Sequence, residues 1–157
     1  MKNKNSKSVK IVTDNRKARF HYEFLETYEA GMMLTGSEVK SLRDAKVNLG
    51  DAYAHFKNGE IWLLNCHISP YEPAAGLNHE PMRSRKLLLH KSEIEKLTGK
   101  LQEKGLTLIP TKIYFKQGRA KVELALAKGK QLFDKRESIK RKESKRTISR
   151  ALKYKSR

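Results

Sequence analysis

The chain has 157 residues, a length that favours one folded domain over two independent cores. Its 35 lysines and arginines against 17 acids give a formal net charge of +18, which repels itself in a compact state unless an anionic partner neutralises it. A disulfide framework and a CxxC metal or redox motif are excluded because Cys66 is the single cysteine. The apolar runs are too short for a secretory signal or a membrane span, so we expect a cytoplasmic protein that does not contact a membrane.

The basic charge is concentrated at the two ends of the chain. Residues 1–19 contain seven bases and one acid, and residues 134–157 contain eleven bases and three acids. Residues 1–10 are polar and without periodicity, which predicts a disordered basic arm. Residues 134–157 carry too few apolar side chains to repay the ordering of the chain, so we expect a basic tail that is disordered when free.

Regular structure is predicted to begin near Ile11. Between Phe20 and Leu34, aromatic and aliphatic residues recur mostly at even spacing, which favours one or two strands. Ala30 and Gly31 permit a bend or a bulge in this segment.

Two local signals and a loop follow. Thr35 with Glu38 three residues later is a capping box, which predicts a short helix. Asn58-Gly59 supplies the positive φ angles of a type I′ turn and so predicts a β-hairpin. Residues 69–86 contain three of the four prolines and no apolar period, which predicts a long, mobile loop.

A second helix is predicted further on. Ser92 and Glu95 are spaced as a capping box, and Gly105 is placed to end the helix. Its apolar face is expected to comprise Ile94, Leu97 and Leu101.

Two long strands complete the predicted domain. They are expected to meet at Gly118, and Pro110 indicates an edge or a bulge in the first of them. The inward-facing side chains of the second strand are expected to be Val122, Leu124 and Leu126.

Five or six short strands, two or three short helices and antiparallel connections predict a mainly β fold. The architecture that fits best is a small closed antiparallel barrel of the oligonucleotide-binding type. We expect this domain to span residues 11–133 and the basic tail to span residues 134–157.

The sequence offers little support for an enzyme. It has no GxSxG, HExxH or Walker motif, and "AKGK" at 127–130 lacks the upstream glycine and the hydroxyl residue that a phosphate-binding loop needs. Cys66 fits a buried strand position, and His67 beside it points to the opposite face. We therefore expect no catalytic residues, no metal ligands and no cofactor.

Basic segments mixed with aromatic residues indicate nucleic-acid binding. "NRKARFHYEF" at 15–24 could neutralise phosphates and stack bases within one segment, and "RSRKLLLHK" at 83–91 repeats the combination. Core strands with solvated basic flanks explain the same patterns. Wound as a helix, residues 134–157 would be basic nearly all round and about 36 Å long, with only Ile148 and Leu152 forming an apolar seam.

From about Asn15 to Leu152 the sequence resembles the SmpB family of SsrA-binding proteins, the protein partners of transfer-messenger RNA (tmRNA). Several motifs occur in the order expected of that family, and together they are highly specific. They are "NRKA" at 15–18, "YEAG" at 28–31, "LTGSEVKSLR" at 34–43, "KVNLGDAY" at 46–53, "HISPYE" at 67–72, "RKLLLHKSEI" at 85–94, "EKGLTLIPTKIYFKQGRAKVELALAKGK" at 103–130 and "DKRESIK" at 134–140.

The resemblance implies an adaptor of trans-translation. The barrel would hold the tRNA-like domain of tmRNA, and the tail would become helical in the vacant mRNA channel of a stalled small ribosomal subunit, near the decoding centre. Elongation factor Tu, carrying aminoacylated tmRNA, is a further implied partner, and we expect a monomer. A ribosomal or ribosome-assembly protein with the same basic arms remains an alternative.

The resemblance also implies a set of site residues. The expected RNA-binding residues are Asn15, Arg16, Lys17, Glu29, Lys40, Asn48, Arg85, Lys86, Leu88, His90 and Lys130. The expected ribosome-binding residues of the tail are Asp134, Lys135, Arg136, Lys140, Lys145, Arg146, Ile148 and Leu152. Phe20 and Ser144 depart from the family pattern, in which histidine and tryptophan are common at these positions.

Overall fold

The computed structural model describes residues 8–103 and 105–155, and it contains nine strands and four α-helices in those ranges. One 3₁₀ helix, η1, is also present. In chain order the elements are β1 (Val9–Asp14), α1 (Arg16–His21), β2 (Tyr22–Met32), α2 (Gly36–Arg43), β3 (Val47–Asn48), β4 (Tyr53–Lys57), β5 (Glu60–Leu64), β6 (His67–Ile68), η1 (Glu72–Leu77), β7 (Arg85–Leu88), α3 (Lys91–Leu101), β8 (Leu106–Lys116), β9 (Arg119–Gly129) and α4 (Leu132–Lys155).

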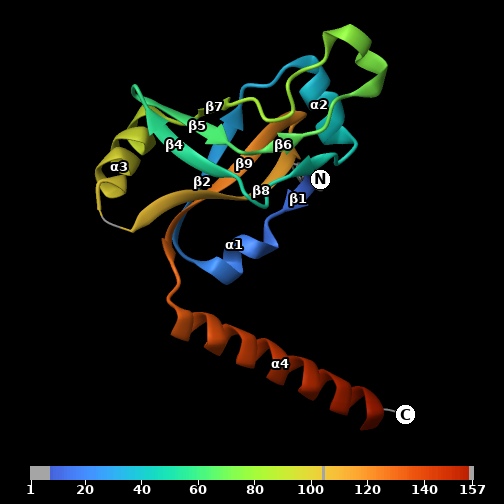
Figure 1. The fold of residues 1–157 in the computed structure, drawn as a ribbon, viewed down its shortest axis with the longest axis vertical. Coiled ribbons are helices and arrows are strands. Elements are labelled where there is room, and N and C mark those ends of the chain that lie inside the picture. Colours follow the sequence, from blue (N-terminus) through green and yellow to red (C-terminus); the bar gives the residue numbers. More distant parts are fainter. Residues whose placement is uncertain (1–7, 104, 156–157) are drawn as a thin grey trace, which may run out of the picture.

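Seven strands form one antiparallel sheet that closes on itself. The order is β1-β8-β4-β5-β7-β2-β9, and β9 pairs with β8 as well, so β1 adds to the outside of a ring of strands (Figure 1). The prediction of a mainly β protein with a closed antiparallel sheet is confirmed, although the strands are more numerous than expected. β3 and β6 form a separate two-stranded sheet.

The core fills the ring and is built by alternation along the strands. Val122, Leu124 and Leu126 of β9 are at most 1% exposed, as predicted for the inward-facing row. Within the described chain, β4 pairs with β8 only at Ala54 and Leu108. α3 covers the ring near this short pairing. The predicted apolar face of α3 packs there through Ile94, Leu97 and Leu101.

Two hairpin turns were predicted correctly. Asn58 and Gly59 have φ angles of 51° and 76° between β4 and β5, as a type I′ turn requires. Gln117 and Gly118 have φ angles of 53° and 74° between β8 and β9. β8 also carries the irregularity indicated by its proline, because its register with β9 shifts between Pro110 and Lys112.

One of the two predicted capping boxes is confirmed. The backbone N–H of Thr35 donates to Glu38 Oε2 at 2.9 Å, at the start of α2. The box predicted at Ser92 is wrong, because α3 begins earlier: His90 is the N-cap residue, and its N–H donates to Glu93 Oε2 at 3.2 Å.

The strand predicted from Phe20 onward starts two residues later. Phe20 belongs to α1, because the Asn15 side chain accepts a hydrogen bond from the Ala18 N–H and caps a short helix there. The irregularity in β2 lies between Phe24 and Glu26 rather than at Ala30 and Gly31. Regular structure also begins at Val9, two residues before the predicted start.

The predicted loop at residues 69–86 is partly ordered into elements. It contains η1, and its last two residues already belong to β7. The N-terminal arm predicted for residues 1–10 lies mostly outside the described residues.

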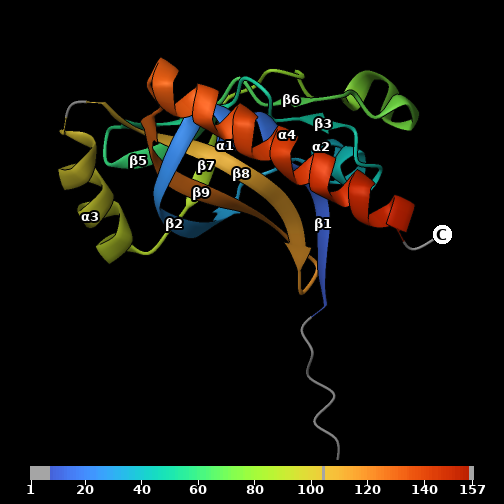
Figure 2. The same ribbon diagram turned by 90° about the horizontal axis from the view of Figure 1, so that it is seen from below.

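α4 projects from the ring as a single helix (Figures 1 and 2). It begins at Leu132, and apart from the half-buried Lys135 and Ser138 its described side chains are exposed. The predicted tail is therefore helical in this structure and does not join the core. Its disorder in the free protein stays a prediction.

Candidate nucleic-acid interface

The expected RNA-binding residues separate into distinct regions of the structure. One group, the outer-face cluster, is defined by Glu29, Lys86, Leu88 and His90. A second group, Arg16, Lys17 and Lys130, lies at the junction of α1, β9 and α4. Together with Lys135, an expected tail residue, this group is called the hinge cluster. Lys40 and Asn48 belong to α2 and β3, and Asn15 and Arg85 are buried.

Asn15 serves the fold rather than offering a free side chain. It is 5% exposed, and its Nδ2 donates to Leu49 O at 3.1 Å and to Pro110 O at 3.0 Å. Its Oδ1 accepts from the Ala18 N–H at 3.2 Å. Asn15 thus holds α1, and with it Arg16 and Lys17, against the ring, while its expected RNA contact stays a prediction.

Arg85 is also engaged inside the protein. Its side chain is fully buried, with Nε donating to Glu38 Oε1 at 2.8 Å and Nη1 donating to Cys66 O at 2.7 Å. Arg83 donates to the other oxygen of the same carboxylate at 2.7 Å. The Arg85 guanidinium is thus occupied by acceptors inside the protein, and its expected RNA contact stays a prediction.

The outer-face cluster is brought together by strand pairing. Leu88 of β7 lies opposite Gly31 of β2, and a Cβ atom at Gly31 would lie 3.3 Å from Leu88 Cβ. Leu88 is 49% exposed, while its neighbour Leu87 is buried, so Leu88 presents an apolar surface outward. β7 ends at Leu88, so His90 reaches this region as the N-cap of α3 rather than as a strand neighbour.

Glu29 contributes a partly neutralised carboxylate to this cluster. It accepts hydrogen bonds from Tyr114 Oη and from Lys116 Nζ, the latter at 3.1 Å. The Tyr114 hydrogen bond holds the pKa of Glu29 below its ordinary value, against the effect of burial and with help from Lys116. Burial, and after it the hydrogen bond to Glu29, raises the pKa of Tyr114. An ionised carboxylate whose charge is offset by a lysine can accept from RNA amino or hydroxyl groups with less repulsion of phosphate.

Three residues of the hinge cluster, Lys17, Lys130 and Lys135, line a cleft of about 670 Å³ between the ring and the base of α4. Lys130 ties the segment after β9 to α1 at one side of the cleft. Its N–H donates to His21 O at 2.9 Å, and its Nζ donates to Arg19 O at 3.0 Å. The concentration of cations fits phosphate binding. The polar side chains lining the cleft include Lys17, His21, Asp51, Lys130 and Lys135.

Lys40 and Asn48 have local partners. Lys40 Nζ lies 5.5 Å from the centre of the Tyr71 ring, and Asn48 Oδ1 accepts from the Gly50 N–H at 2.7 Å. Both residues remain exposed, in a third region formed by α2 and the small sheet.

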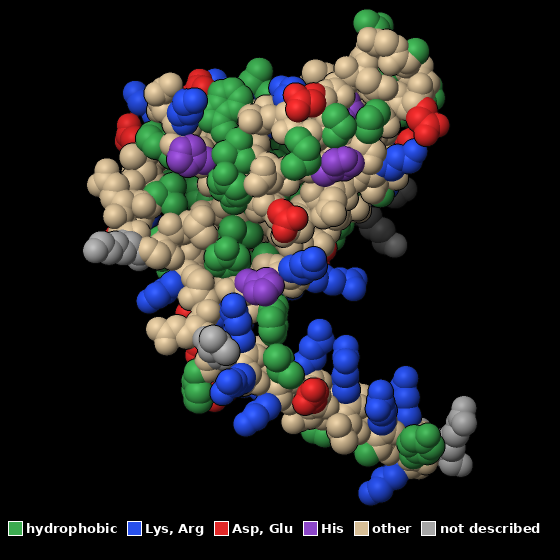
Figure 3. Space-filling view, viewed as in Figure 1, with side chains coloured by type: hydrophobic (Ala, Val, Ile, Leu, Met, Phe, Trp, Pro, Cys, Tyr) green, Lys and Arg blue, Asp and Glu red, His purple; other side chains and the backbone are tan. Residues whose placement is uncertain are grey.

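The expected tail residues all lie on α4. Ile148 and Leu152 are 60% and 64% exposed, one helical turn apart. Lysine and arginine side chains project from more than one side of the helix (Figure 3). This surface suits an environment that is anionic on several sides. The expected tail residues are Asp134, Lys135, Arg136, Lys140, Lys145, Arg146, Ile148 and Leu152.

Other kinds of site find little support in the described residues. They contain no group of three or more His, Cys, Asp or Glu placed to hold a metal ion. Burial raises the pKa of the Cys66 thiol to about 11, so the thiol stays protonated. No helix in the described ranges is long and apolar enough to cross a membrane.

Comparison with known proteins decides the family. The family model described as SmpB protein matches residues 12–154. The chain belongs to the SmpB family. It is 58% identical over 154 residues to the SsrA-binding protein of Trichodesmium erythraeum (strain IMS101), covering 98% of this chain and 99% of the relative. It is 61% identical over 147 residues to that of Desulforudis audaxviator (strain MP104C), covering 94% and 96%.

A solved structure is similar as well. It is described as "tmRNA-SmpB: a journey to the center of the bacterial ribosome", and it shares 55% sequence identity and a TM-score of 0.65 with this chain. The match covers 76% of this chain and 85% of that one.

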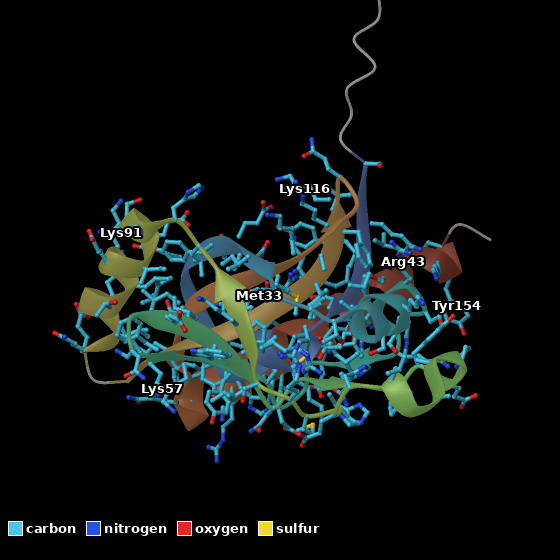
Figure 4. The ribbon with its side chains drawn as sticks, turned by 90° about the horizontal axis from the view of Figure 1, so that it is seen from above. Met33, Arg43, Lys57, Lys91, Lys116 and Tyr154 are labelled. Carbon is cyan, nitrogen blue, oxygen red and sulfur yellow. The ribbon has the colours of Figure 1, made fainter. Side chains whose placement is uncertain are left out.

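Sequence reasoning missed two residues of this SmpB-family chain that border the outer-face cluster, the exposed Met33 and the partly buried Trp62. Met33 is 51% exposed where β2 ends beside β7, and it lies at the centre of the view onto this face (Figure 4). Trp62 lies directly opposite Lys86. The signal that could have found Trp62 is the Asn58-Gly59 turn, because it fixes which side chains of the hairpin share a face.

Proposed function

We propose that this SmpB-family chain is a non-enzymatic adaptor that binds the tRNA-like domain of tmRNA and brings it to stalled ribosomes for peptide tagging. The outer-face cluster supplies contacts to the RNA, and α4 enters the mRNA channel of the small subunit when that channel is vacant. The chain acts as a cytoplasmic monomer, and elongation factor Tu with aminoacylated tmRNA joins the complex.

One observation carries this proposal: α4 is helical, basic on several sides and exposed along nearly its whole described length. A helix that belonged to the core would show a broad apolar stripe. A channel walled by phosphates offers opposite charge around the whole helix, and mRNA already in the channel would exclude it. Occupancy of the channel thus distinguishes stalled from translating ribosomes.

The test separates RNA binding from tagging. A chain ending at Lys130 keeps the ring and loses α4, so its affinity for the tRNA-like domain should stay within about threefold of the full chain. Tagging on ribosomes stalled without downstream mRNA should be abolished. Filter binding and a reconstituted tagging reaction measure the two effects.

A chain ending at Lys155 is the matched control, because it keeps all of α4 and should tag normally. A loss of RNA affinity as complete as the loss of tagging would contradict the division of labour. Co-sedimentation adds a second check, because a constitutive ribosomal protein would stay with translating ribosomes, whereas the adaptor joins stalled ones together with its RNA.

A further inference from the structure

The outward face of the β4–β5 hairpin presents an aromatic ring between two basic strands. Trp62 pairs with His55 of β4 on one side and with Lys86 of β7 on the other. Its neighbours Ile61 and Leu63 are fully buried in the core, so the alternation of the strand directs Trp62 outward. Trp62 is only partly buried and is not among the described residues that pack against the core.

Trp62 lies in a cleft rather than on a flat surface. The cleft measures about 660 Å³, within the range of roughly 300–1,000 Å³ typical of small-ligand sites. A cleft of this volume can hold one ligand ring stacked on the Trp62 indole. Its lining residues are His55, Lys57, Asn58, Glu60, Trp62, Leu64 and Ser84.

Lys57 and Glu60 are the charged lining residues of the cleft, and Lys86 adds a further cation beside Trp62. Glu60 lies opposite Lys57 across the hairpin, and its Oε1 accepts from Lys86 Nζ at 2.5 Å. Glu60 thus pairs with Lys86, and Lys57 and His55 lie on the neighbouring strand β4. Hydrophobic, basic and histidine side chains lie next to one another over β4 and β5 (Figure 3).

The cleft is continuous with the outer-face cluster. Lys86 belongs to that cluster and is the direct partner of Trp62, while Leu88 follows two residues along the same face of β7. An RNA strand lying over Leu88 and Lys86 would therefore meet the indole ring next.

We propose that Trp62 is a stacking platform for an unpaired RNA base, with Lys57 and Lys86 taking the flanking phosphates. The inference deepens the proposed function by extending the RNA-binding surface from β7 across β5. An RNA ligand is favoured over a protein segment because a ring flanked by cations satisfies base and backbone together, as in single-strand binding proteins. Duplex RNA would not engage the ring, because its bases are already stacked on one another.

Trp62 is the only tryptophan of the chain, so the tryptophan fluorescence of the protein comes from this site alone. Titrating the full chain with a short single-stranded oligoadenylate should quench the tryptophan fluorescence. A blunt RNA duplex with the same number of phosphates should bind by charge without quenching it.

Variants then measure the contact. Trp62→Ala should weaken binding of the oligoadenylate and of the tRNA-like domain between about 5-fold and 150-fold, with no change in the salt dependence. Trp62→Phe keeps a ring and should stay within about tenfold of the parent. Lys86→Gln should instead reduce the salt slope. Leu77→Ala is the matched control, because Leu77 is 89% exposed at the far tip of η1.

The outcomes separate the inference from the proposed function. If the parent chain binds the tRNA-like domain, but the oligoadenylate causes no quench and Trp62→Ala binds both RNAs normally, the stacking platform is disproved and the adaptor function stands. If the oligoadenylate quenches but the tRNA-like domain does not bind, the adaptor function fails and the platform stands. Weaker ribosome association with unchanged RNA affinities would assign Trp62 to a protein contact and overturn the inference.

Discussion

Glu38 is a charged carboxylate that is completely buried. Its side chain has no exposed surface, yet its oxygens receive hydrogen bonds from Arg83, Arg85 and the Thr35 N–H. Burial alone would raise the pKa of Glu38, but these partners outweigh it, so the pKa lies below its ordinary value. The carboxylate joins α2, the loop before β7 and β7 itself.

Because the pKa of Glu38 is lower in the folded chain than in the unfolded chain, its contribution to stability is present above about pH 4.5 and is lost as the pH falls below that value. Glu38→Gln should cost about 3 kcal/mol of unfolding free energy near neutral pH and should reduce the further loss in acid. Urea unfolding at about pH 7 and about pH 3.5 measures both effects.

Glu26→Gln is the matched control, because Glu26 pairs with Lys100 on the surface and its pKa is also lowered, chiefly by that hydrogen bond. It should change neutral stability little. Equal losses for the two variants would show that burial of the Glu38 network does not matter.

Asn15 and Arg85 show what sequence cannot reveal at this scale. Both are polar and lie in basic segments, so composition places them on the surface. Their burial depends on partners far away in the chain: Asn15 binds the carbonyl of Pro110, and Arg85 binds Glu38. The family motifs mark such residues as important, but they do not distinguish a residue that contacts RNA from one that stabilises the fold.

At the scale of elements, turns and helix ends could be predicted from a few neighbouring residues wherever a single sequence signal was present. The Asn58-Gly59 turn needs two consecutive positive φ angles, which few sequences supply, and it was found correctly. In the segment before α3, two capping boxes overlap with a shift of two residues. His90 prevails there, and propensity alone favours serine.

α4 allows a test of independence from the ring. Proline inside a helix costs about 3 kcal/mol or more. If the free tail is disordered as predicted, Ser144→Pro should leave the circular dichroism signal at helical wavelengths unchanged, whereas a helix already formed in the free chain would lose signal. The unfolding midpoint of the ring should not change, since the described side chains of α4 are almost all exposed.

Ser144→Ala, which favours the helix, controls for loss of the hydroxyl group. A lower unfolding midpoint for the ring in the proline variant alone would mean that α4 supports the core after all.

For the whole molecule, charge is distributed by region: of the net +18, residues 134–157 hold +8 and residues 1–19 hold +6. Composition and charge predicted the division of the chain into a folded body and a cationic extension, and the family motifs added the expected RNA contacts. They could not predict that the expected RNA contacts fall into separate regions, because that follows from how the sheet closes.

Self-repulsion should make the free protein more stable as salt rises. Moderate sodium chloride screens charges beyond about 10 Å, so the melting temperature of the full chain should increase with salt. The chain ending at Lys130 lacks the +8 of residues 134–157 and should respond less. Differential scanning calorimetry over a salt series measures the difference, and equal slopes for the two chains would refute this account.

The junction between β9 and α4 has a mechanical consequence. Only residues 130 and 131 separate the two elements, and Lys130 is tied to α1 by two hydrogen bonds. A helix of 24 residues is about 36 Å long, so a turn of about 10° at Gln131 would swing its far end by about 6 Å. A small change of backbone angle at Gln131 would therefore displace the cationic end of α4 over a wide arc while the ring stays in place.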